Sequence, residues 1–201
     1  MQKEEGTVQK VVVIGASAGG VSALAKIISS LPKDLPAAIL IVQHIKADRT
    51  TQLPEYFNRH SHLPVHLAED GMLLKVGTVY IAEPGKHLIV NNMRLELIIS
   101  EPVNYVRPSI DVLFASAAKE FGSNVVGVVL SGSNRDGTRG CQEIKQKGGI
   151  TIAQDEETSQ YFSMPGSAIN EGAIDYVLPL SEIAGKIISL IKKNLYNPIN
   201  S

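Results

Sequence analysis

The sequence predicts an α/β protein with three layers, in which helices cover both faces of a doubly wound, mostly parallel sheet. Several short runs are continuously apolar and β-branched, among them 11–14, 38–42 and 125–130. Such runs are typical of strands that are buried on both faces. Segments with helical spacing of their apolar residues alternate with these runs, which indicates βαβ units.

The first third of the chain is predicted to begin with the nearly unbroken apolar strand 11–14. The elements expected there, in order, are strand 11–14, helix 21–30 before Pro32, strand 38–42, helix 50–59 and strand 65–67. Asp48 is the expected N-cap of the second helix, because its side chain can accept a hydrogen bond from a free helical N–H.

Residues 77–98 are predicted to form a small hairpin region. Three short apolar runs, at 77–82, 88–90 and 95–98, are separated by turn residues. Asn91-Asn92 is the expected hairpin turn, because Asn tolerates positive φ.

The last half of the chain continues the α/β alternation. The expected elements are a helix from Ile110, the central strand 125–130, helix 139–147, strand 150–153, helix 164–171, strand 177–178 and helix 181–193. Ser181 is the expected N-cap of the last helix.

Composition limits the classes of protein to which this chain can belong. The 201 residues carry a formal net charge of −1 without a basic run, which argues against nucleic acid or an anionic membrane as the main partner. No apolar stretch is long enough to span a membrane, and the single Cys141 suits a reducing, cytoplasmic location. We expect one domain at 11–193 between tails at 1–10 and 194–201.

Ser17 is the strongest candidate for a reactive group. It lies in the segment 15–20, Gly-Ala-Ser-Ala-Gly-Gly, directly after the first apolar run and before the first helix. Glycines allow a tight turn that exposes the hydroxyl, and the helix N-terminus supplies N–H groups and a positive dipole end.

A base and a carboxylate stand at matching places. His44 follows the strand 38–42, and Asp136 follows the strand 125–130. Since open α/β sheets place their sites at the carboxyl ends of strands, Ser17, His44 and Asp136 are predicted to meet as a catalytic triad.

Two better-known motifs fit the Ser17 loop less well. In the dinucleotide fingerprint, Ser17 replaces the middle glycine, and Gln43-His44 stands where an acidic ribose ligand belongs. In the α/β-hydrolase elbow, several strands precede the serine and the acid precedes the histidine, unlike here. A loop that only binds phosphate or packs tightly is the third alternative. We expect no cofactor, and the spacing of His60, His62 and His66 does not indicate a metal site.

From Val11 to Leu190 the chain resembles the catalytic domain of the CheB-type protein-glutamate methylesterases of bacterial chemotaxis. The segments that carry this resemblance are 14–20, 42–44, 82–87, 107–114, 130–137, 153–155 and 164–168. The resemblance places the family's Ser-His-Asp triad on Ser17, His44 and Asp136. About ten residues precede the first strand, so we expect no receiver domain in this chain.

The resemblance also points to residues around the triad, in the oxyanion hole or along the cleft. These are Ala18, Ser133, His87 and Met164. The family commonly has Thr where Ala18 stands, and Met then Gly where Ser133 and Asn134 stand.

The expected function is a serine hydrolase that removes methyl groups from γ-glutamyl methyl esters of chemoreceptors. The resemblance implies glutamine deamidation as a second activity, and chemoreceptor cytoplasmic helices as the main partner. A methyltransferase or a separate receiver protein is a further expected partner. The alternative is a non-catalytic module that docks on receptors or on a methyltransferase.

Overall fold

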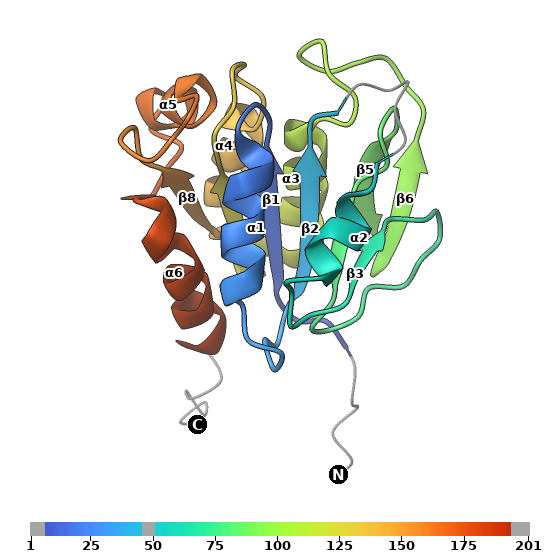
Figure 1. The fold of residues 1–201 in the computed structure, drawn as a ribbon. Helices are drawn as coiled ribbons and strands as arrows, with labels where there is room; N and C mark the ends of the chain where they lie inside the picture. The colour runs from blue at the N-terminus through green and yellow to red at the C-terminus, as the bar shows by residue number, and fades with distance from the viewer. Residues whose placement is uncertain (1–6, 46–50, 194–201) are drawn as a thin grey trace, which may run out of the picture.

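A sheet of seven parallel strands runs through the part of the chain that the computed structural model describes, residues 7–45 and 51–193 (Figure 1). In sheet order the strands are β3 (Val65–Leu67), β4 (Val79–Ile81), β2 (Ala38–Gln43), β1 (Val11–Ala16), β7 (Val125–Val129), β8 (Ile150–Gln154) and β9 (Tyr176–Leu178). Every neighbouring pair is parallel. The predicted fold class is confirmed.

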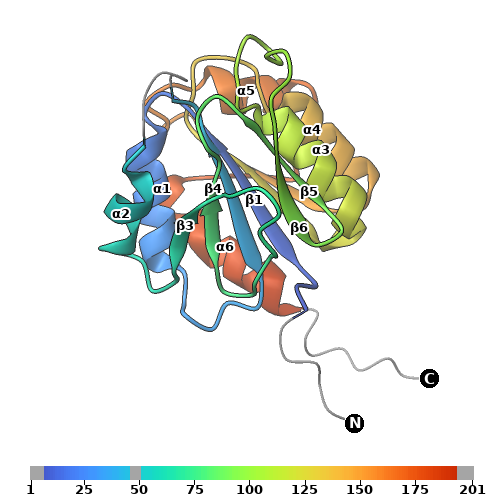
Figure 2. The ribbon, with the colours of Figure 1, turned by 90° about the vertical axis from the view of Figure 1, so that its right-hand side faces the viewer.

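Helices cover both faces of this sheet. The helices on one face are α1 (Gly20–Ser30), α2 (Leu53–Asn58) and α6 (Leu180–Lys193). The helices on the other face are α3 (Ile110–Phe121), α4 (Thr138–Gln146) and α5 (Ser163–Asn170). Figure 2 shows α1 and α2 on one side of the strands and α3 and α4 on the other.

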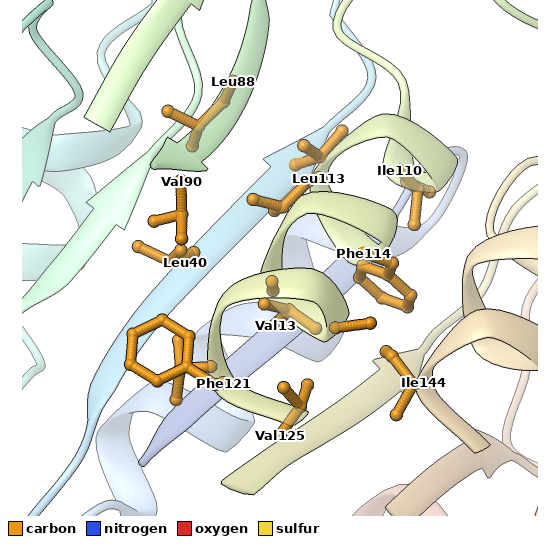
Figure 3. Packing of buried hydrophobic residues seen from close by; sticks show 14 of the residues in the cluster. Val13, Leu40, Leu88, Val90, Ile110, Leu113, Phe114, Phe121, Val125 and Ile144 are labelled. Carbon is orange, nitrogen blue, oxygen red and sulfur yellow. The ribbon is translucent and has the colours of Figure 1, made fainter. Parts of the chain in front are cut away.

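Alternating side chains of the central strands fill two separate cores. On β1, Val11 and Val13 face the layer of α3 and α4, whereas Val12 and Ile14 face the layer of α1 and α6. Figure 3 shows Val13 beneath α3, with Ile144 of α4 nearby. Burial on both faces is the physical reason why these strands read as continuous apolar runs.

The predicted hairpin region is smaller than expected. Residues 87–98 form an antiparallel pair, β5 (His87–Asn91) with β6 (Arg94–Ile98), which packs on α3. The run around residue 80 instead enters the main sheet as β4, parallel to β2 and β3. Its three residues are all buried, as befits an inner strand.

The hairpin turn lies one residue later than predicted. Asn91 is the last residue of β5, and Asn92 and Met93 both have positive φ, 49° and 61°. Two consecutive residues with positive φ match the right-handed twist of the strands that they join. The side chain of Asn91 instead donates to Glu96 Oε1 at 2.8 Å.

Two helix starts also differ from the expectation. The second helix begins at Leu53, and Asp48 lies outside the described residues. The last helix begins at Leu180, so Ser181 lies in its first turn and is not its N-cap. The Leu180 N–H donates to the hydroxyl of Thr158 at 3.0 Å, so a residue distant in sequence supplies the capping acceptor.

The expected tails lie partly outside the described residues. Residues 1–6 and 194–201 are not described, whereas residues 7–10 are. Val8 is buried, and Lys10 Nζ donates to the carbonyls of Leu190 and Ile191 at 3.2 and 2.6 Å. The residues just before β1 therefore contact the last turns of α6.

The strand order reverses at β1. The chain runs from β1 outward through β2, and returns to the other side of β1 with β7 and then β8. Open α/β sheets bind ligands outside the carboxyl ends of strands at such a switch point. The loops after β1, β2 and β7 all leave this edge, the upper one in Figure 1.

Gly15 keeps α3 close to β1 beneath this edge. A Cβ at Gly15 would lie 2.4 Å from Ile110 Cγ2, in the first turn of α3. We predict that Gly15→Ala lowers the free energy of unfolding by about 1–3 kcal/mol, because the helix must shift to relieve the overlap. Urea unfolding of the two proteins measures this difference.

Gly185→Ala is the matched control. Gly185 is exposed on α6, and nothing lies within 4 Å of a Cβ built there. This substitution should raise stability by about 0.5–1 kcal/mol through helix propensity alone. Equal effects of the two substitutions would show that close packing at Gly15 does not matter.

Candidate active site

The turn after β1 presents Ser17 at the carboxyl edge of the sheet. Gly19, with φ of 74°, is the N-cap of α1, and this conformation turns the chain directly into the helix. The Ser17 N–H donates to the Ser131 carbonyl at 3.0 Å. The Ser17 carbonyl accepts from the Gly20 N–H and from Gln43 Nε2, both at 2.9 Å. The backbone of the candidate nucleophile is therefore held from both neighbouring strands.

His44 directly follows β2, next to the Ser17 turn. Its backbone N–H donates to the Ala16 carbonyl at 3.0 Å, which continues the pairing of β1 and β2. Its ring Nε2 lies 3.0 Å from Asp136 Oδ2, and the side chain is 9% exposed. The imidazole is thus largely buried, and one ring nitrogen faces a carboxylate.

Asp136 is fully buried and accepts hydrogen bonds from five groups. The donors are His44 Nε2 at 3.0 Å, the Ser109 hydroxyl at 2.8 Å, the Ile110 N–H at 2.6 Å, the Asp111 N–H at 3.2 Å and Asn104 Nδ2 at 3.1 Å. Two of them are backbone groups at the N-terminus of α3, where the helix dipole also favours a negative charge. Ser109 is in addition the N-cap of this helix.

These donors keep Asp136 ionised inside the protein. Burial acts to raise the pKa of Asp136, but the hydrogen bonds from His44, Ile110 and Ser109 outweigh it and hold the pKa below its usual range. A buried carboxylate that is charged and correctly placed can fix one imidazole tautomer and stabilise an imidazolium.

A second buried carboxylate, that of Asp111, lies beside the first. It accepts from the Gly137 N–H at 2.9 Å and the Gly140 N–H at 2.8 Å, while Asn104 Nδ2 bridges Asp111 and Asp136. Burial and then the nearby charge of Asp136 raise the pKa of Asp111, against the opposing effect of these hydrogen bonds. The environments thus shift the pKa values of the two carboxyls in opposite directions, so Asp136 is the one that loses its proton first.

The residues predicted around the triad lie in two groups. The backbone N–H groups of Ala18 and Ser133 have no partner within residues 7–45 and 51–193, so they are free to bind a substrate oxygen. Ser133 is exposed on the loop before Asp136, and the Ala18 carbonyl accepts from the Ser131 hydroxyl at 2.8 Å.

His87 and Met164 lie behind the site and not along its edge, contrary to the prediction. His87 is 1% exposed; its Nδ1 accepts from the Ser109 N–H and its Nε2 faces the Glu101 carbonyl, both at 3.1 Å. His87 therefore holds the backbone of Ser109, the N-cap of α3, through this hydrogen bond. Met164 is fully buried in the core under Gly132, and its N–H donates to the Gly132 carbonyl at 2.9 Å.

A hollow of about 390 Å³ opens beside His44. Its walls come from the segment after β2 and from residues 102–108. The tip of that second segment carries Asn104 and Tyr105, both with positive φ, and Tyr105 is fully exposed. Because Asn104 is bonded to both buried carboxylates, the same turn that walls the hollow is tied to the triad.

Several polar residues that support the site were not predicted from the sequence. Gln43 and Gln154 are buried at the ends of β2 and β8, and Gln154 Oε1 accepts from the Ser131 N–H at 3.0 Å. A glutamine as the last residue of an otherwise apolar strand is a signal that could have revealed both. Asn104 carried no such signal, because its partners are distant in sequence.

Within the described residues, no group of three or more His, Cys, Asp or Glu side chains is placed to hold a metal. No helix in this part of the chain is long and apolar enough to cross a membrane.

Comparison with known proteins shows the family of this chain. Residues 12–187 match the profile of the family described as CheB methylesterase. The chain belongs to the CheB methylesterase family.

Individual relatives extend this result. An Archaeoglobus fulgidus protein named protein-glutamate methylesterase/protein-glutamine glutaminase is 43% identical over 92% of this chain and 54% of its own length. A similarly named Anaeromyxobacter dehalogenans protein, with the suffix 2, is 45% identical over 87% of this chain and 51% of its own.

A solved structure shares both fold and sequence with this CheB-family chain. The crystal structure of the Thermotoga maritima CheB methylesterase catalytic domain matches with a TM-score of 0.88 and 42% identity, over 92% of this chain and all of that one. The present chain spans about half the length of the two curated relatives.

Asp136→Asn should lower the turnover number by up to about 10⁴-fold. An amide replaces one acceptor oxygen with a donor, so His44 loses its anionic partner and N–H groups of α3 face another N–H. The same mismatch should cost about 1–3 kcal/mol of stability. Ester hydrolysis and urea unfolding measure the two effects.

Asp155→Asn is the control for this substitution. Asp155 follows β8 at the same edge, but its side chain contacts Thr158 and not the triad. It should retain turnover within about threefold. If Asp155→Asn were the damaging change and Asp136→Asn the mild one, the carboxylate would be wrongly assigned.

We predict that Asp111 makes the free energy of unfolding depend on pH. Its pKa is raised in the folded state, so the protonated form stabilises the protein at low pH. That contribution is lost as pH rises through the folded pKa. Asp111→Asn, which stays neutral, should therefore become more stable relative to the parent protein between pH 4 and pH 7. A stability difference that does not change with pH would show that Asp111 is not held in this way.

Proposed function

We propose that this protein is a serine hydrolase that removes methyl groups from γ-glutamyl methyl esters of chemoreceptors, giving glutamate and methanol. The observation that carries the proposal is the pairing of His44 with the buried, ionised Asp136 beside the Ser17 turn. The names of the curated relatives supply the reaction class.

In the proposed first step, Ser17 Oγ attacks the ester carbonyl. Since His44 Nε2 faces Asp136 Oδ2, the other ring nitrogen, Nδ1, is the one available to accept the Ser17 proton. Asp136 then stabilises the imidazolium across the 3.0 Å contact. The imidazolium returns the proton to the departing methoxide, and methanol leaves.

The tetrahedral intermediate needs donors for its oxyanion. The Ala18 N–H, at the start of α1, and the Ser133 N–H, on the loop before Asp136, are the two unpaired groups proposed for this role. Each such donor contributes about 3–4 kcal/mol to transition-state stabilisation. Backbone groups also need no particular side chain at either position.

In the second step, water attacks the acyl-enzyme, and His44 again acts as the base. The same acyl-enzyme forms from glutamine when ammonia leaves in place of methanol. The relatives' names include protein-glutamine glutaminase, so we propose deamidation of receptor glutamines as the second activity.

The proposed partner is the cytoplasmic helical part of a methyl-accepting chemoreceptor. Tyr105, which is fully exposed at the hollow, and Val106 beside it offer apolar contact area for a helix that carries the ester. A methyltransferase or a separate receiver protein is a further partner that the family membership suggests. A non-catalytic docking module is less well supported, because it would not require the ionised Asp136 on His44.

Ser17→Ala should abolish methanol release from methylated receptor membranes and leave the fold intact, because the hydroxyl carries the acyl group and contributes no hydrogen bond to the described fold. The matched control is Ser29→Ala on the exposed side of α1, whose hydroxyl contacts only the Lys26 carbonyl. Substantial methanol release by well-folded Ser17→Ala protein would overturn the assignment of the nucleophile.

A further inference from the structure

We propose that Asn134 is a positioning residue that caps the base nitrogen of His44 in the resting protein and slows proton transfer from Ser17. This inference rests on the proposed hydrolase function, and it concerns the same site. It starts from a contact that the triad does not need: Asn134 Nδ2 lies 3.2 Å from His44 Nδ1.

The orientation of the Asn134 amide is set by the backbone. The Asp136 N–H donates to Asn134 Oδ1 at 3.1 Å, so the oxygen end of the amide is fixed on a donor. The NH₂ end therefore faces the imidazole. Nδ2 carries only hydrogens to donate, so it requires a lone pair on His44 Nδ1.

The other side of the ring requires the same tautomer. Asp136 is ionised and only accepts, so His44 Nε2 must carry the proton that lies between them at 3.0 Å. In the neutral imidazole, Nδ1 then holds the lone pair, which is the atom that Asn134 caps. Three hydrogen bonds thus close a ring through Asn134, His44 and Asp136.

This ring has a cost for catalysis. Nδ1 is the only imidazole atom that can take the Ser17 proton, and a donor already occupies it. Within the described parts of the chain, the Ser17 hydroxyl forms no hydrogen bond. The Asn134–His44 bond must therefore break before Ser17 becomes a nucleophile. Ser133 and Arg135, on either side of Asn134, are exposed, which leaves space for the amide to swing away when substrate enters.

A fluorophosphonate probe measures this step without a receptor. Ser17 Oγ bonds to phosphorus, the P–F bond breaks, fluoride leaves and the Ser17 proton passes to His44 Nδ1. We expect Asn134→Ala to be labelled about two- to tenfold faster than the parent protein, because one hydrogen bond to the base is gone.

Asn134→Asp should change the rate in the opposite direction. A carboxylate of the same shape keeps the acceptor for the Asp136 N–H, but it accepts from a protonated Nδ1 and so removes the lone pair. Labelling should fall below that of the parent protein. A merely structural role would slow both variants, so opposite signs are the signature of the cap. Asn170→Ala, an exposed position on α5, should stay within twofold of the parent rate.

Three results separate the possible failures. If the parent protein is labelled at Ser17 and Asn134→Ala is labelled equally fast or more slowly, the proposed role of Asn134 is wrong, whereas the proposed hydrolase function is unaffected. If neither the parent protein nor any variant is labelled, both proposals fail. If Asn134→Ala is labelled and the parent protein is not, the Asn134–His44 bond blocks the reaction of Ser17 completely, which supports the proposed role of Asn134.

Nitrogen NMR of His44 tests the same proposal in the parent protein and does not depend on any variant folding. Near neutral pH, Nε2 should carry the proton, and Nδ1 should show the shift of a hydrogen-bonded acceptor. A proton on Nδ1 in the resting neutral ring would overturn the cap.

Discussion

The buried carboxylate of Asp136 is the group on which the rest of the site depends. A charge with no exposed surface is tolerated only when donors surround it, and here five do. They come from the end of β2, the start of α3 and the turn that carries Asn104. Satisfying one charge therefore fixes the loop of Asp136 against the end of β2 and against the stretch 104–111, both of which are far from Asp136 in the sequence.

The Ser17 turn is likewise held by buried hydrogen bonds, but from neutral groups. Gln43 and Ser131 bind the turn from opposite neighbouring strands, and Gln154 binds Ser131 in turn. The buried side chains of Gln43 and Gln154 bond to the very loops that they hold, although Gln43 Oε1 has no partner within the described residues. A nucleophile carried on such a loop needs little rearrangement before reaction, which is the physical meaning of a preorganised site.

The sequence predicted the fold class because β-branched apolar runs and turn residues carry local physical signals. It also predicted that Ser17, His44 and Asp136 lie at one edge, since parallel strands bring their carboxyl ends together. It did not predict that β4 joins the main sheet, because a three-residue buried strand looks the same in a hairpin. Nor did it predict the roles of His87, Met164 or Asn104, whose contacts depend on packing between distant segments. The predicted N-cap of α6, Ser181, was wrong for the same reason, because the acceptor at this helix end is the distant Thr158.

Asp136 holds His44 through Nε2 and so leaves Nδ1 as the ring nitrogen that we propose as the base for Ser17. A crystal structure of the fluorophosphonate adduct tests it most directly. We expect phosphorus bonded to Ser17 Oγ, its oxygen on the N–H groups of Ala18 and Ser133, and His44 Nδ1 toward the adduct with Nε2 still on Asp136. A flipped ring with Nε2 on the adduct, or phosphorus on another residue, would contradict it.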